Sequence, residues 1–166
     1  MNPKDEIVLI VDKDNKITGS APRHQMRAGG LPHRATYILV FNSLGELFVQ
    51  KRTMTKDIYP GYYDVAAGGV VLAGECYDKS AKRELAEELG IKETDLTSHF
   101  TFFYQEDKNR VWGRVYSCIY DGELILQAEE VESGYFMSPQ EVLALSKKER
   151  FTRDGIYVLK RYLELK

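Results

Sequence analysis

Three carboxylates, Glu84, Glu87 and Glu88, lie at helical spacing and share one face at about 100° per residue. Glu88 falls at the edge of the apolar stripe of the same helix, which consists of Ala81, Leu85 and Leu89. Like charges four residues apart destabilise a helix, and partial burial adds a desolvation cost. A divalent cation such as Mg2+, which binds carboxylate and phosphate oxygens, would remove both costs. The pattern indicates a metal–diphosphate site, and the alternative is a solvated face in which Arg83 pairs with Glu87.

The loop before this helix favours the metal site. Gly68, Gly69 and Gly74 allow a backbone path that side chains would block. Glu75 places a fourth carboxylate just ahead of the helix, and Gly90 is typical of a helix end.

The whole stretch resembles the Nudix box, with every defined position filled. In order, the matching residues are Gly69, Glu75, Arg83, Glu84, Leu85, Glu87, Glu88, Gly90 and Ile91. We therefore identify residues 69–91 as a Nudix box and the chain as a member of the Nudix superfamily.

The resemblance implies a hydrolase that uses Mg2+, with Mn2+ as a substitute, to cleave a diphosphate linked to another group. It implies that Glu84 and Glu88 bind the metal directly and that Glu87 binds it through water or at a second metal. Glu84, Glu87 and Arg83 are the expected catalytic residues, and Gly69 brings backbone close to the metal and substrate.

The general base stays open at this stage. In the family this role falls to a box glutamate or to a carboxylate from a distant loop. The candidates in this chain are Glu84, Glu87, Glu106, Glu129 and Glu130.

A second segment, which contains Arg52, Lys56 and Pro60-Gly61, resembles the isopentenyl-diphosphate isomerase branch of the superfamily. In that branch the arginine and the lysine hold the substrate diphosphate. His33 matches the second of the two early histidines of the isomerase. The resemblance, which runs from about residue 7 to residue 135, implies that Arg52, Lys56 and His33 contact the substrate.

The isomerase chemistry itself is not expected. Gly68 stands where the isomerase has its cysteine, and Val70 where it has a histidine. Asn109 and Val111 replace two glutamates, and the first early histidine falls near Met26. Without these groups the acid–base pair that moves a double bond is missing. An isomerase-like enzyme and a non-catalytic diphosphate sensor remain the alternatives, and the intact box favours hydrolysis.

The expected elements form an α+β fold, a Nudix-type α/β/α sandwich with a mixed sheet between helices. The N-terminal hairpin spans residues 6–20, and residues 21–32 form a short helix or loop. Further strands are expected at 35–41 and 46–51, which form the clearest hairpin, and at 63–67, 99–104, 110–120 and 134–137. Ser138-Pro139 opens a helix at 140–145, and a last helix spans about 153–163.

Length and composition favour a single domain over residues 1–166, because the chain has 166 residues and is 43% hydrophobic. The net charge of −2 gives no electrostatic footprint for a nucleic-acid polymer. We expect a small-molecule diphosphate as the partner, no membrane association and a cytoplasmic location, because a signal peptide, a membrane-length apolar run and paired cysteine spacing are absent. The N-terminal hairpin and the aromatic strands could support a homodimer.

Overall fold

The computed structural model describes residues 2–166, whose strands form one mixed sheet of eight strands. Its elements are the 3-10 helix η1 (Pro3–Asp5), β1 (Ile7–Val11), β2 (Ile17–Pro22), α1 (Arg23–Gly29), β3 (His33–Phe41), β4 (Leu47–Arg52), β5 (Tyr63–Asp64), α2 (Tyr77–Leu89), β6 (Thr97–Glu106), β7 (Asn109–Ile119), β8 (Val131–Met137), α3 (Pro139–Leu145) and α4 (Arg153–Glu164). The strands β3 and β7 are parallel, and the other pairings are antiparallel. The predicted α+β fold with a mixed sheet between helices is confirmed.

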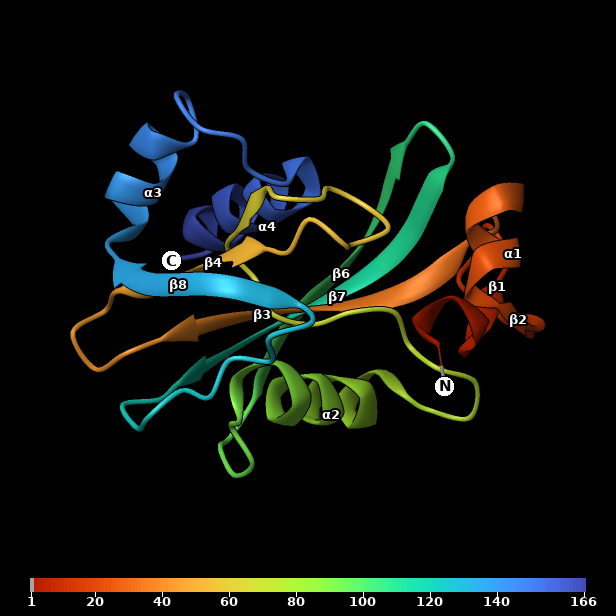
Figure 1. Ribbon diagram of the computed structural model, residues 1–166, viewed down its shortest axis with the longest axis horizontal. Coiled ribbons are helices and arrows are strands. Elements are labelled where there is room, and N and C mark those ends of the chain that lie inside the picture. Colours follow the sequence, from red (N-terminus) through yellow and green to blue (C-terminus); the bar gives the residue numbers. More distant parts are fainter. Residues whose placement is uncertain (1) are drawn as a thin grey trace.

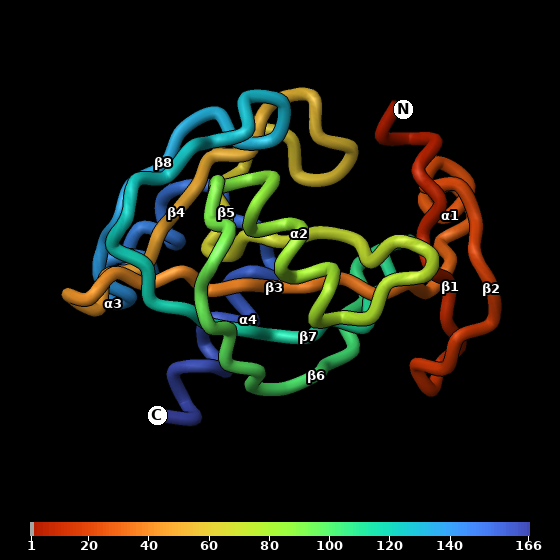
Figure 2. The backbone as a smooth tube through the Cα atoms, turned by 90° about the horizontal axis from the view of Figure 1, so that it is seen from below, coloured from red at the N-terminus to blue at the C-terminus, as the bar shows by residue number. Residues whose placement is uncertain are grey.

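The sheet is covered on both faces, α2 lying on one side and α3 and α4 on the other (Figure 1). Successive residues of a strand point to opposite faces, so Ile38 packs toward α2 while Tyr37 and Leu39 pack toward α4. On α2 the predicted stripe is buried against the sheet through Ala81, Leu85 and Leu89. Seen from the α2 side, β1, β2 and α1 stand at the opposite end of the sheet from β8 and α3 (Figure 2).

The predicted hairpin of residues 35–41 and 46–51 is wrong over most of its length. The strands β3 and β4 pair only at Phe41 and Leu47, next to their turn. Beyond that pair β3 follows β7 in parallel along its whole length, and β4 follows β8. Both strands are buried on both faces, so the backbone groups along both edges of each strand need hydrogen-bonding partners. Beyond Phe41 and Leu47, β3 and β4 do not supply these partners to each other.

The gap between the diverging strands is filled by residues 63–70. On one side Tyr63 and Asp64 pair with β4, and on the other Ala67 and Val70 form isolated bridges with β3. The expected strand at 63–67 is therefore regular only at Tyr63–Asp64. This wedge delivers the glycines of the box to the middle of the sheet.

Other local expectations are confirmed. The N-terminal hairpin is β1–β2, and α1 ends at Gly30, which adopts a left-handed conformation. Ser138 caps α3 through a capping box with Glu141. The strand predicted at 134–137 begins earlier, at Val131, because its pairing with β4 continues to Arg52.

Gly68 is required where the wedge crosses β3. Its φ is +127°, and a Cβ atom there would lie 2.1 Å from the Thr36 carbonyl oxygen. Gly74 also has a positive φ, of +84°, but a Cβ atom there would meet nothing within 4 Å. A side chain at Gly68 would thus meet both backbone strain and a steric clash, whereas a side chain at Gly74 would meet backbone strain alone.

We expect Gly68→Ala to lower the free energy of unfolding by several kcal/mol, because it combines strain of about 1–3 kcal/mol with overpacking of about 1–3 kcal/mol. Gly74→Ala carries strain alone and should lose about 1–2 kcal/mol. Urea denaturation of both variants tests this ranking. Equal losses would show that the contact with Thr36 does not constrain the loop.

Candidate active site

Arg83 is the hub of the box. Its guanidinium donates to both oxygens of Glu75 at 2.6 and 3.0 Å, to Glu84 at 3.0 Å and to Glu87 at 3.1 Å. Burial works against the charge of Glu75, but the hydrogen bonds from Arg83 outweigh it and hold the pKa of Glu75 below its usual value. Arg83 thus fixes a loop carboxylate and two helix carboxylates in one network.

Glu88 is the most buried carboxylate of the site, with 4% of its surface exposed. One of its oxygens accepts a hydrogen bond of 2.7 Å from the Gly68 backbone N–H. Burial, and next the negative charge of Glu84, raise the pKa of Glu88. Glu84 packs against Gly69, where a Cβ atom would stand 2.8 Å from its Oε1. The glycine is therefore needed for Glu84 to reach its position.

Two cations act on this carboxylate pair. Arg83 is ion-paired with Glu84 at 3.0 Å, and the charge of Lys56 opposes the rise in the pKa of both Glu84 and Glu88. Lys56 is itself ion-paired with Glu130. The pair therefore consists of a half-buried Glu84 that Arg83 contacts and a buried Glu88 whose one hydrogen bond among the described residues comes from a backbone N–H. A set of buried oxygen donors with excess negative charge fits a hard divalent cation.

The carboxylates do not already surround one point. Within residues 2–166 no group of three or more His, Cys, Asp or Glu side chains has the arrangement of a metal site. Glu84 and Glu87 instead point to Arg83, and Glu88 to Gly68. Metal binding by all three would require side-chain rotation.

A cleft opens beside Gly68 and Gly69, and the substrate residues expected from the sequence line it. These residues are His33, Arg52, Lys56 and Gly69. Arg52 is held by the Ile58 carbonyl, at 2.9 and 3.2 Å, and by Asp64 at 3.4 Å. Both cations therefore line the cleft while paired with a carboxylate, Arg52 with Asp64 and Lys56 with Glu130. A diphosphate would either displace these carboxylates or bind beside them.

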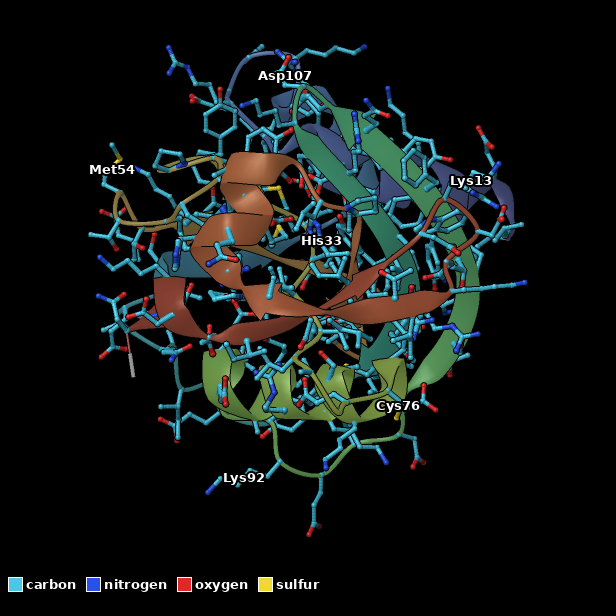
Figure 3. All side chains as sticks on the ribbon, turned by 90° about the vertical axis from the view of Figure 1, so that its right-hand side faces the viewer. Lys13, His33, Met54, Cys76, Lys92 and Asp107 are labelled. Atoms are coloured by element: carbon cyan, nitrogen blue, oxygen red, sulfur yellow. The ribbon has the colours of Figure 1, made fainter. Side chains whose placement is uncertain are left out.

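His33 begins β3 and lies in the interior, whereas Met54 and Asp107 project at the periphery (Figure 3). Its Nδ1 is 2.9 Å from the Leu31 carbonyl oxygen. Burial lowers the pKa of His33 to about 4, so the ring is neutral and Nδ1–H donates to Leu31. The Nε2 atom is then a hydrogen-bond acceptor.

The loop of residues 53–62 lines part of the cleft, and hydrogen bonds fasten its middle to two other elements. Asp57 accepts a hydrogen bond from Arg27 at 3.0 Å, which ties the loop to α1. Tyr59, which has a strained φ of +51°, donates to Glu106, and Glu106 also accepts from Arg153 of α4. Both carboxylate oxygens of Glu106 therefore accept hydrogen bonds, one of which holds the loop.

Several cleft residues carry no motif in the sequence. Asp64 and Asp154 stand on the wall of the cleft with Arg27 and Asn109, and they come from β5, α4, α1 and β7. The wedge is joined to the start of α4 by the hydrogen bonds from Thr152 N–H to the Tyr63 carbonyl and from the Thr152 hydroxyl to Asp64. Single charged residues next to strand and helix ends gave no signal that distinguished them from solvated surface.

Comparisons with known proteins agree with this geometry. The family model of the NUDIX domain matches residues 31–159. An uncharacterised Nudix hydrolase of Pseudomonas aeruginosa is 46% identical over 159 residues, which are 96% of this chain and 94% of the relative. A second uncharacterised Nudix hydrolase, from Yersinia pestis, is 44% identical and covers 95% and 86% of the two chains.

Solved structures share the fold at low sequence identity. The crystal structure of DR0079 from Deinococcus radiodurans has a TM-score of 0.83, with 24% identity over 94% of this chain and 98% of that one. The NUDIX domain of Shewanella oneidensis NrtR, solved with ADP ribose, has a TM-score of 0.63, with 12% identity over 80% and 86%.

The family match and the relatives identify an enzyme class, the hydrolases of diphosphate bonds. The chain belongs to the Nudix family and is a Nudix hydrolase. Among the described residues no helix is long and apolar enough to cross a membrane.

We expect Glu88→Gln to stabilise the metal-free protein. The amide oxygen keeps the hydrogen bond from Gly68, and the change removes a buried negative charge beside Glu84. A gain of about 0.5–2 kcal/mol is typical when strain at a functional site is relieved. Urea denaturation in EDTA measures it, with Glu164→Gln on exposed α4 surface as the unchanged control. A loss of stability would mean that Glu88 is a structural acceptor.

We expect Tyr59→Phe to release the loop of residues 53–62. The hydrogen bond from Tyr59 to the Glu106 carboxylate is lost, and bonds to charged groups contribute about 1.5–3 kcal/mol. Hydrogen exchange of the loop amides should therefore accelerate by about tenfold. Tyr62→Phe is the matched control, because Tyr62 packs on the Tyr59 ring at 5.1 Å without a corresponding bond in the described structure. Equal exchange in both variants would remove the fastening role of Tyr59.

Proposed function

We propose that the protein hydrolyses a diphosphate linked to another group in a Mg2+-dependent reaction at the Gly69–Ile91 site. The observation that carries the proposal is Glu88, which is buried next to Glu84 and has no salt-bridge partner among the described residues. Glu84 is paired with Arg83, and both carboxylates lie beside the cleft that Arg52 and Lys56 line. A buried charge without a partner is costly, so its retention favours a functional role.

Glu84 and Glu88 would hold the metal directly, with Glu87 at its edge. When bound, Mg2+ supplies charge neutralisation and orientation of the diphosphate. Arg83 positions Glu84 and Glu87 and keeps Glu75 ionised. The wedge presents the Gly69 backbone beside Glu84, where no side chain obstructs the approach of the diphosphate.

Arg52 and Lys56 would hold the diphosphate from the opposite wall of the cleft. Arginine offers a planar fork to phosphate oxygens, and lysine a point charge. Their present carboxylate partners, Asp64 and Glu130, keep both side chains extended into the cleft. His33 would contact the group beyond the diphosphate.

The general base falls to a carboxylate that can face attacking water. Glu106 is less suited than the other candidates, since its two oxygens already accept hydrogen bonds from Tyr59 and Arg153. Glu130 stands close enough to Glu88 to raise its pKa, after the larger effects of burial and Glu84. We therefore favour Glu84, Glu87 or Glu130 as the base.

Two alternatives give different results. An isomerase-like enzyme would convert isopentenyl to dimethylallyl diphosphate, but Gly68 and Val70 supply no proton at the required positions. A sensor would bind a diphosphate without cleaving it, and the NrtR domain, which shares this fold, was solved in complex with ADP ribose. The relation to the isomerase branch, the single domain over residues 1–166, the cytoplasmic location and the homodimer stay predictions.

We expect the protein to release phosphate or nucleotide from at least one compound in a panel of nucleotide sugars, dinucleotides, deoxynucleotides and prenyl diphosphates, with Mg2+ or Mn2+ present. Glu88→Gln should lower kcat by about 100-fold or more, since even outer-shell partners of a metal contribute 10–100-fold. Glu164→Gln should retain full activity. Full Mg2+-dependent turnover by Glu88→Gln would exclude Glu88 as a metal ligand.

A further inference from the structure

Among residues 2–166, three long strands pair with one neighbour only, β2 with β1, β6 with β7 and β8 with β4. An unpaired strand edge is a template for pairing with another chain, so folded proteins protect such edges with short strands, charged side chains or proline. The longest of the three is β6, which has ten residues and runs outside β7 at the margin of the sheet (Figure 2). The character of its free edge therefore bears on what else the protein binds.

The edges of β2 and β8 are protected. The strand β2 has six residues and contains Gly19 and Pro22, both of which disfavour pairing. The strand β8 has seven residues and exposes Glu132, which is ion-paired with Lys51 of β4. A further strand that docked on either edge would lose pairing at a proline or meet a charge.

The edge of β6 has no such protection. From Thr97 to Gln105 the strand contains no Asp, Glu, Lys, Arg, Gly or Pro. Its register with β7 is irregular only between Ser98 and Phe100, so the residues that follow are evenly spaced. Within residues 2–166 no backbone hydrogen bond reaches the outer edge of β6. Alternate N–H and C=O groups along this edge can therefore pair with a further strand.

Aromatic side chains flank this edge on both faces of the sheet. On one face Phe103 is 42% exposed and packs on Trp112, with 5.2 Å between the ring centroids. On the other face Phe102 and Tyr104 pack on Tyr157 of α4, which is 38% exposed. Exposed apolar surface next to an unpaired edge is typical of an interface.

The residue pattern of β6 is complementary to itself. In an antiparallel pair with a twofold axis at Phe102, Phe100 lies opposite the partner's Tyr104, and Thr101 lies opposite the partner's Phe103. Residues directly opposite each other share a face, so aromatic rings meet on the α4 face and a threonine meets an aromatic ring on the α2 face. No like charges are brought together, because residues 97–105 contain no acidic side chain, lysine or arginine. A second copy of the chain therefore fits this edge, whereas an acidic or basic peptide would find no opposite charge along it.

We propose that the protein is a homodimer in which the β6 strands of two copies pair antiparallel about Phe102 and join the two sheets into one. A twofold axis uses the same surface on both copies, as in other closed dimers. The pairing would supply the outer backbone groups of β6 with hydrogen-bonding partners and cover Phe103 and Tyr157. The proposal is independent of diphosphate hydrolysis and is tested without substrate.

The first test measures the mass of the full chain in solution without metal or substrate. Sedimentation equilibrium of the wild-type protein at micromolar concentration should give twice the mass of one chain. Phe103→Lys places a charge beside the edge and should raise the dissociation constant of the dimer by at least about tenfold. Tyr135→Lys is the matched control, because Tyr135 is 46% exposed on the edge strand β8, and the same change there should leave the dimer intact.

A second variant separates loss of the dimer from loss of folding. Thr101→Lys keeps the contact between Phe103 and Trp112, and it should also give a monomer, with the circular dichroism spectrum of the wild-type protein. Hydrogen exchange reports on the edge directly. The outward-facing amides of residues 100–105 should exchange at least about tenfold faster in Thr101→Lys than in the wild-type protein at the same concentration.

The register is tested by exchanging charges. In the proposed pairing Thr101 faces the partner's Phe103, so Thr101→Lys combined with Phe103→Asp in one chain creates an ion pair on each side of the twofold axis. Opposite charges that face each other across two strands stabilise the pair. The double variant should therefore recover the dimer that each single change disrupts.

Three results would contradict the proposal. A wild-type protein that stays monomeric up to millimolar concentration would overturn it, and so would a dimer that both Phe103→Lys and Thr101→Lys leave intact. Disruption by Tyr135→Lys instead would assign the interface to β8 and equally overturn it. A double variant that stays monomeric would overturn the register about Phe102.

Discussion

The structure is organised around two neighbouring carboxylates, Glu84, which Arg83 contacts, and Glu88, which is buried and has no salt-bridge partner among the described residues. Glu84 and Glu88 lie on the sheet-facing side of α2, and each is in contact with a glycine of the preceding loop. Their mutual repulsion destabilises the folded state, and it is tolerated because Ala81, Leu85 and Leu89 anchor the helix on the same face. The neighbouring apolar contacts thus hold in place a charge arrangement that would otherwise move into water.

That arrangement depends on the divergence of β3 and β4. If the two strands paired fully, no gap would exist for residues 63–70, and the glycine loop could not enter the sheet. Instead the two strands separate beyond Phe41 and Leu47, while β7 pairs with the other edge of β3 and β8 with the other edge of β4. The wedge then brings the Gly68 N–H to Glu88 and opens the cleft on its other side. One feature of the sheet therefore creates both the contact with the box carboxylates and the cleft.

The cleft is closed by polar contacts rather than by apolar packing. Asp57, Tyr59 and Lys56 each bind a different neighbouring element through a charged hydrogen bond. Such contacts are individually modest and exchange readily with water, so the loop can open without disturbing the core. A strained Tyr59 adds to the tendency to open. Opening of the loop for substrate entry would therefore leave the sheet intact.

The sequence by itself determined where the carboxylates of the box lie on α2. The spacing of Glu84, Glu87 and Glu88 placed them on one helix face, and the helix period does not depend on tertiary contacts. Local signals likewise predicted the end of α2 at Gly90 and the cap of α3 at Ser138. Only the tertiary structure decided that β3 pairs with β7, that Glu106 fastens a loop, and that Asp64 and Asp154 share a cleft with His33. Those relations join residues far apart in the chain, and they follow from which buried strand completes its hydrogen bonds with which neighbour.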